Sequence, residues 1–257
     1  MNIDSMKKLN IVFFTSFILL IIGWALIKEF DLVNDLFLPK PKELLFAFKI
    51  AFVEHSFARD ILMSVSRVFI AFIFSLTLAV PTALLMCNYL RIEKLLSPYI
   101  DFIRYLPVPA LIPLIILFLG IDEAAKIALL FIGTYFQLVL LIIESIKDIP
   151  KEHHDLTFSL KLNRVQQMYF TFRRILPSIY DNSRITIGWC WTYVIIAELI
   201  ASENGIGHMI KEAQRFSNTP YIYVGILTMG IIGFLSDFSF KYFYSTFFPY
   251  KSKGKII

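Results

Sequence analysis

The segment DLTFSLKLNRVQQMYFTFRRILPS, from Asp155 to Ser178, is basic and amphipathic, and it stands between two long apolar stretches. Leu156, Leu160 and Val165 recur among polar neighbours, a spacing typical of a short amphipathic helix. The interval between the apolar stretches, residues 147–182, is too long for a simple helix-to-helix connection. We expect an ordered excursion that either fills a groove on a soluble partner or lies on anionic lipid.

The composition is that of a membrane protein. The chain has 257 residues, of which 57% are hydrophobic and 18% charged, and its mean hydropathy is +0.68. Ordinary soluble domains carry about a quarter charged residues. The net charge of +5 is spread among apolar runs, so it indicates membrane topology and not nucleic-acid binding. Cys87 and Cys190 both lie in apolar runs, so we expect no disulfide framework.

Six apolar stretches are each near the roughly 20 residues that cross a bilayer. We therefore expect a single all-α, polytopic membrane domain over residues 1–257, with a cytoplasmic helix in the excursion. The third stretch contains Pro107, Pro109 and Pro113, which remove backbone donors, so we expect it to begin as an extended segment or a re-entrant turn packed against protein. The expected spans are residues 10–29, 61–88, 98–119, 124–146, 183–202 and 222–246.

The orientation follows from the distribution of Lys and Arg among the loops. If the N-terminus is cytoplasmic, the inner loops hold most of these residues, which predicts that both termini face the cytoplasm. No small-residue cleavage site follows the first apolar run, where Lys28-Glu29-Phe30-Asp31 comes next, so we expect an uncleaved first span. In the outer loop, LPKPKELLFAF (38–48) fits either a short interfacial helix or a plain connector.

The sequence contains none of the common catalytic motifs that we searched for. It has no P-loop pattern, no His-Glu-x-x-His run and no Gly-x-Ser-x-Gly elbow, so we do not expect it to hydrolyse ATP or to be an enzyme. The Gly-Ile-Gly of residues 205–207 lacks the strand-turn-helix context of a nucleotide site. His153 and His154 are adjacent and point apart on a helix, so we expect no metal site.

Polar residues inside the predicted spans are costly and are the remaining candidates. Glu198 and Arg67 either lie near a translocation path or bond neighbouring helices. Asp237 and Lys241 are four residues apart, and we expect them to pair on one helix face. Trp191 fits either a path lining or an interfacial aromatic belt.

Five stretches in one order along residues 37–240 resemble a known family. They are FLPKPKELL (37–45), SVSRVFIAF (64–72), RYLPVPALIPLIILFLGI (104–121), SLKLNRVQ (159–166) followed by ILP (175–177), and AELIASENGIGHMI (197–210). Together they resemble the membrane-spanning permease subunits of bacterial binding-protein-dependent ABC importers, specifically the nitrate, sulfonate and taurine type.

The resemblance implies a multi-pass protein of the bacterial cytoplasmic membrane that forms the path for a small solute. It implies a cytoplasmic ATP-binding subunit, an external solute-binding protein and a second permease copy as partners. ATP and Mg would be used by the ATPase, with no cofactor bound by this chain. The coupling loop that would dock into the ATPase comprises Asp155, Leu156, Thr157, Ser159, Leu160, Lys161, Asn163 and Arg164.

This loop departs from the family pattern at two places. Asp155-Leu156-Thr157 stands where Glu-Ala-Ala is expected, and Lys161 stands where Gly is expected. Because Gly adopts left-handed backbone that Lys adopts only at a cost, we expect altered docking geometry and a specialised or weakened ATPase contact.

Two other classes of protein remain open at this point. The first is a secondary carrier or channel that uses Glu198 as a proton-linked carboxylate. The second is a membrane assembly factor that transports nothing. The sequence does not identify the solute, which in importers of this type is largely selected by the external binding protein.

Overall fold

The computed structural model describes residues 3–54 and 56–249, and every regular element in that part of the chain is a helix, as expected for an all-α protein. The elements are α1 (Ile3–Glu29), α2 (Pro41–Glu54), α3 (Phe57–Asn88), α4 (Leu90–Ile103), the 3-10 turn η1 (Val108–Leu111), α5 (Ile112–Leu119), α6 (Glu123–Lys147), α7 (Lys151–Ser159), α8 (Arg164–Ala201), α9 (Ile206–Arg215) and α10 (Thr219–Phe247).

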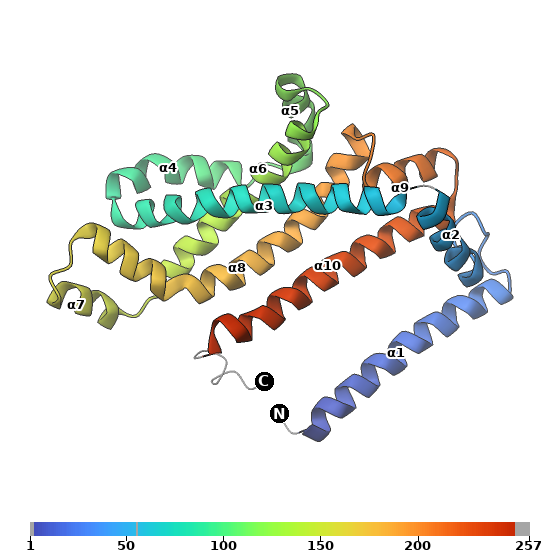
Figure 1. The fold of residues 1–257 in the computed structure, drawn as a ribbon, viewed down its shortest axis with the longest axis horizontal. Coiled ribbons are helices and arrows are strands. Elements are labelled where there is room, and N and C mark those ends of the chain that lie inside the picture. Colours follow the sequence, from blue (N-terminus) through green and yellow to red (C-terminus); the bar gives the residue numbers. More distant parts are fainter. Residues whose placement is uncertain (1–2, 55, 250–257) are drawn as a thin grey trace.

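Three long helices, α3, α6 and α8, pack against one another, and α10 lies alongside α8 (Figure 1). Helix α7 lies at one end of this bundle, which we call the α7 end (Figure 1). Helices α2 and α9 lie at the opposite end, the α9 end, where both contact α10. Helix α1 runs apart from the bundle over most of its length (Figure 1). Both the coupling loop and the Gly-Ile-Gly turn therefore lie at ends of the bundle, far from each other.

Helix α3 approaches α6 closely because small residues recur along one of its faces. Ala71, Ser75, Ala79 and Ala83 are spaced four apart, and all four are fully buried. In a membrane, small residues at this spacing let two helix backbones come together. The hydroxyls of Ser75 and Thr134 lie 2.8 Å apart across this contact, so the helix pair is joined by a hydrogen bond as well as by packing.

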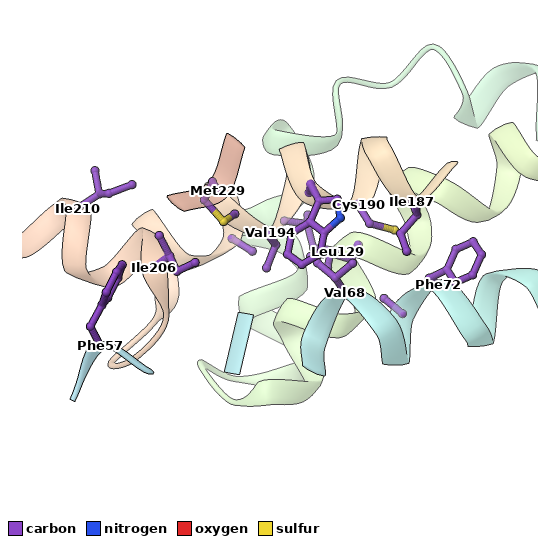
Figure 2. Close-up of a cluster of buried hydrophobic side chains, with 14 of the residues drawn as sticks. Phe57, Val68, Phe72, Leu129, Ile187, Cys190, Val194, Ile206, Ile210 and Met229 are labelled. Atoms are coloured by element: carbon purple, nitrogen blue, oxygen red, sulfur yellow. The ribbon is translucent and has the colours of Figure 1, made fainter. Parts of the chain in front are cut away.

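The apolar core has two parts. One cluster lies toward the α9 end and brings together Phe57, Val68, Leu129, Val194 and Ile206 from four helices (Figure 2). The other contains side chains of α3, α4, α6 and α8, among them Met86, Ile100, Leu138 and Ile175. Both clusters include residues of α3, α6 and α8, so these helices share a core along most of their length.

Three helices are long and apolar enough to cross a membrane among the described residues: α3, α6 and α10. The pair formed by α4 and the segment Val108–Leu119 is bent by 95°, so it is either a fourth, broken span or a re-entrant loop. The predicted first span lies in α1, where side chains are described for residues 15 and 16 and from residue 18 onward, and the predicted fifth lies in α8. The structure thus supports a polytopic protein, while the count of six spans remains a prediction.

The third predicted span, 98–119, is not one continuous helix. It is helical from Leu90 to Ile103, breaks before Val108 and then turns sharply. Pro107 is extended, with φ −67° and ψ 109°, and it has no N–H to continue the helix. Arg104 lies in this break.

Helix α8 also corrects the sequence analysis. We expected a separate excursion over residues 147–182, but α8 begins at Arg164 and runs without interruption through Pro177 to Ala201. The excursion is therefore α7, a short turn and the first part of α8. The Leu-Pro pair does not end a helix here.

The loop after α1 is ordered by an ion pair. The buried Lys28 ammonium donates to the Val33 carbonyl at 2.7 Å and lies 2.5 Å from the Asp35 carboxylate. The hydrogen bond from Lys28 lowers the pKa of Asp35 below its usual value. The Thr219 hydroxyl donates to the Leu36 carbonyl at 2.5 Å, which ties this loop to α10. The segment 38–48 contains the start of α2, so its helical interpretation is confirmed.

Candidate functional site

A buried ion-pair network joins α3, α6, α8 and the turn before α9. Its centre is Arg67, whose side chain is 1% exposed. The guanidinium donates to both oxygens of Glu123 at 2.6 Å and to Glu198 Oε1 at 2.6 Å. It also donates to the carbonyl of Asn204 at 2.9 Å and to the amide oxygen of the same residue. Every N–H group of the guanidinium therefore has an acceptor, as a buried arginine requires.

Glu198 is fully buried and fully partnered. Its carboxylate accepts from Arg67, from the Ser64 hydroxyl at 2.7 and 2.9 Å, and from the backbone N–H of Gly207 at 2.8 Å. A buried carboxylate with this many donors is held as the charged form of an ion pair. The arrangement fits the structural interpretation of Glu198, in which it bonds neighbouring helices.

The Gly-Ile-Gly turn is built around this carboxylate. Gly205 has φ +109°, and a Cβ there would lie 2.5 Å from Cδ of Glu198. A Cβ on Gly207 would lie 2.6 Å from Cβ of Glu198. Only glycine permits both the backbone conformation and the close approach. The N–H of Gly205 donates to Asp60 at 2.7 Å, so the turn is also fastened to α3.

Other polar residues of the spans lie outside the network. Trp191 is buried in the apolar core, and its indole N–H has no hydrogen-bond acceptor among the described residues. Asp237 pairs with Lys241 at 2.8 Å, as its spacing predicted. Asp237 also binds Arg184 of α8, a contact between two helices that the sequence analysis missed. Among the described residues, no group of His, Cys, Asp and Glu side chains is placed to hold a metal ion.

The coupling loop is well defined at the α7 end. Helix α7 ends in a Schellman motif, in which the N–H of Lys161 donates to the Phe158 carbonyl at 2.9 Å and that of Leu162 to the Thr157 carbonyl at 3.3 Å. Lys161 has φ 52°, the left-handed conformation that this position of the motif requires. The glycine expected here would adopt it without strain, whereas an L-residue pays about 1–2 kcal/mol.

Helix α8 begins with a capping box that the sequence analysis overlooked. The Asn163 side chain accepts from the Gln166 N–H at 2.9 Å, and the Gln166 side chain accepts from the Asn163 N–H at 2.9 Å. The sequence pattern Asn-x-x-Gln, which is typical of a helix start, would have predicted this capping box. The predicted docking residues therefore form the end of α7, the turn and the start of α8.

Most of these loop residues face outward. Thr157 is buried, whereas Leu156, Leu160 and Val165 are 48%, 56% and 72% exposed and Phe158 is 82% exposed. The pattern of Leu156, Leu160 and Val165 predicted one short helix, but the structure divides these residues between the end of α7 and the start of α8, and about half or more of each side chain is exposed in the single chain. This outward apolar surface, formed by Leu156, Phe158, Leu160 and Val165, is called the α7 surface below.

Comparison with known proteins agrees with this architecture. Residues 75–248 match the family of binding-protein-dependent transport system inner membrane components. A "probable ABC transporter permease protein" of Brucella melitensis is 30% identical over 84% of this chain and 87% of its own length. The taurine transport system permease protein TauC of Escherichia coli is 26% identical over 87% of this chain and 83% of its own length. This chain belongs to the family of binding-protein-dependent transport system inner membrane components.

Solved structures show the same fold. A chain of the MetNI methionine ABC transporter, in an inward-facing conformation, aligns with a TM-score of 0.68 at 14% identity, covering 74% of this chain and 94% of that chain. A chain of an amino acid ABC transporter aligns with a TM-score of 0.57 at 18% identity, covering 77% and 96%.

Replacing Glu198 tests the importance of the network. Glu198→Gln leaves Arg67 buried with one ionic partner fewer, and we expect a loss of about 3 kcal/mol of unfolding free energy, because breaking a buried pair from one side leaves an uncompensated charge. Unfolding of the purified protein in detergent measures the loss. The control is Asp237→Asn at a half-exposed pair, where we expect no more than about 1 kcal/mol. Equal effects of the two changes would contradict the assigned role.

Lys161 offers a test of the left-handed turn. Lys161→Gly should leave the rate of chymotrypsin cleavage after Phe158 unchanged or slower, because it relieves about 1 kcal/mol of backbone strain. Lys161→Val should make cleavage several-fold faster, because a β-branched residue strongly disfavours positive φ. Lys151→Val, on the first turn of α7, is the matched control and should have little effect. Faster cleavage in the glycine variant would show that the turn is not required.

Proposed function

We propose that this chain is the path-forming permease of an ATP-driven importer and that the α7 surface docks into a cytoplasmic ATP-binding subunit. The observation that carries the proposal is the set of apolar side chains at the α7 end that no part of the described chain covers. Leu156 and Leu160 are four residues apart at the end of α7, a spacing with which a short helix fills a groove on a partner. Because the chain belongs to a family of transport permease components, we propose that the partner is an ATP-binding subunit.

Helix lengths favour a protein partner over lipid. At 1.5 Å per residue, the 32 residues of α3 and the 38 residues of α8 extend about 48 Å and about 57 Å. The hydrocarbon core is only about 30 Å thick. The bundle therefore extends beyond the lipid, and α7 lies at its tip (Figure 1). A helix in that position is accessible to a soluble domain.

ATP hydrolysis would then take place in the partner. The sequence holds no P-loop pattern, and the chain belongs to a family of transport permease components. We propose that ATP and Mg bind to the ATPase subunit and that this chain binds no cofactor. In the same arrangement the α7 end and both termini face the cytoplasm, and the α9 end faces an external solute-binding protein.

A second permease copy is proposed to cover the broken span. Between α4 and η1 the backbone is irregular, and Tyr105 is 75% exposed. On α5, Leu117 and Phe118 are 78% and 77% exposed. Irregular backbone at membrane depth is not tolerated against lipid, and it must be covered by protein or line water. Two copies that meet at this segment would cover it and would enclose a path between them.

The proposed solute class is the small oxyanions and sulfonates. It rests on relatives that include TauC and the nitrate import permease protein NrtB of Synechocystis, which is 25% identical over 76% of this chain and 71% of its own length. A proton-linked carrier is less well supported, because the Glu198 carboxylate is already occupied by Arg67, Ser64 and Gly207.

The docking proposal predicts the outcome of charge substitutions on the α7 surface. Leu160→Glu and Phe158→Glu should lower retention of the ATPase in purification about tenfold or more, the effect of losing one apolar anchor. ATP-driven uptake should fall while insertion into the membrane is unchanged, because both side chains are exposed.

The matched control is Leu32→Glu, an exposed leucine in the loop that precedes α2, which should retain the ATPase. Normal retention and uptake in both α7 variants would exclude the proposed docking surface.

A further inference from the structure

A cavity of about 200 Å³ opens beside the broken span. Its walls come from three parts of the chain: the break and η1, helix α6, and helix α8. The lining includes Arg104, Pro107, Pro109, Gln137 and Tyr193. The ring of Tyr193 lies against Gly133, where a Cβ would be only 2.7 Å away, so glycine at this position makes the room in which the ring sits.

The cavity lies near the middle of the bundle. Gly133 and Gln137 are in the central turns of α6, which begins at Glu123 and ends at Lys147. Thr134, between them, bonds Ser75 in the middle of α3. Arg104 reaches the same level because α4 turns back along α3 before it ends. The Arg104 side chain, 33% exposed, is therefore held midway along the bundle, and a charge at membrane depth has to face protein or water.

Three polar side chains in this cavity have hydrogen-bonding capacity to spare. The Arg104 guanidinium donates to the Tyr105 hydroxyl at 2.9 Å. Its Nε is buried and has no hydrogen bond among the described residues, although Asp101 Oδ1 lies 3.7 Å away. The Gln137 amide and the Tyr193 hydroxyl likewise have no hydrogen-bond partner in the described part of the chain. Of these three groups the Arg104 Nε is the buried one, and buried polar groups are normally paired. Gln137 and Tyr193 are half-buried on the wall of the same cavity, so the three together point to a ligand.

We propose that this cavity is a binding site for a small soluble oxyanion, such as a nitrate ion or the sulfonate group of an organic solute. Arg104 supplies the charge, and Gln137 and Tyr193 supply neutral hydrogen bonds. The inference deepens the proposed function and rests on it for the role of the site in transport. A lipid headgroup does not fit the site, because headgroups lie at the membrane surface and not at this depth.

The chemistry of the site suits passage of a solute. A single guanidinium with two neutral groups binds an anion weakly, so the anion can leave. The nearby Asp101 carboxylate, 3.7 Å from Arg104, provides a counter-charge when the cavity is empty. A cavity of about 200 Å³ is smaller than the roughly 300–1,000 Å³ of drug-sized ligand sites, so it selects solutes with few heavy atoms.

Protection of a cysteine from alkylation tests the site on the full-length permease. Leu106→Cys, on the cavity wall, is placed in a Cys87→Ser background, and its reaction with the neutral reagent N-ethylmaleimide is timed in lipid nanodiscs. Nitrate and methanesulfonate should slow the reaction several-fold at constant ionic strength. Gluconate, an anion larger than the cavity suits, should not slow it.

Substitution of Arg104 identifies the group responsible. Arg104→Gln should raise the anion concentration for half-protection about tenfold or more, because it removes a charge-assisted hydrogen bond. Gln137→Leu keeps the charge and should raise it by a smaller factor. Arg184→Gln, at a half-exposed arginine of α8 outside the cavity, is the control and should leave protection unchanged.

The outcomes separate this proposal from the proposed function. Alkylation needs neither ATP nor a binding protein, so protection that is absent, equal with gluconate or unaffected by both cavity variants would overturn the oxyanion site even if ATP-driven uptake is normal. Protection that depends on Arg104 would support the site even if no ATP-driven uptake were found. If the Arg104 variant does not insert, the Gln137 variant decides the question.

Discussion

The buried ion pair between Arg67 and Glu198 is the interaction on which the rest of the arrangement depends. It joins α3 to α8, and the same guanidinium binds Glu123 at the start of α6 and Asn204 in the turn before α9. Charges removed from water are strongly destabilising unless they are paired. The buried Arg67 needs hydrogen-bond acceptors from several helices at once. Its contacts therefore hold α3, α6 and α8 in a fixed arrangement at the α9 end.

Helix α8 connects the coupling loop, the cavity and the ion-pair network in one continuous helix. The Asn163 capping box defines its start next to α7, Tyr193 contributes to the mid-depth cavity, and Glu198 fixes its far end to α3. An uninterrupted helix transmits a displacement at one end to the other. In this account, movement of a docked ATPase reaches the cavity through α8, while the ion-pair network keeps the α9 end together.

Much of the fold follows from sequence, and the exceptions have physical causes. Apolar length predicts α3, α6 and α10, and the motif order from 37 to 240 identifies the family. The pairing of Arg67 with Glu198 was not predictable, because the two residues are far apart in the chain and each is only a costly charge until its partner is known. The continuity of α8 through Pro177 was not predictable either, because a proline inside a helix removes a backbone hydrogen bond and normally bends or ends the helix. Lys161 adopts the left-handed backbone conformation, although the family pattern has glycine at this position.

Spin labels at position 158 provide the most direct test of the central claim, that α7 is moved by an ATPase. Phe158→Cys in the Cys87→Ser background places one label on each α7 of the assembled complex, since Phe158 is 82% exposed. We predict that ATP shortens the distance between the two labels as the ATPase subunits close. A label distance that is the same with and without ATP, in complexes that hydrolyse ATP and import solute, would contradict the account.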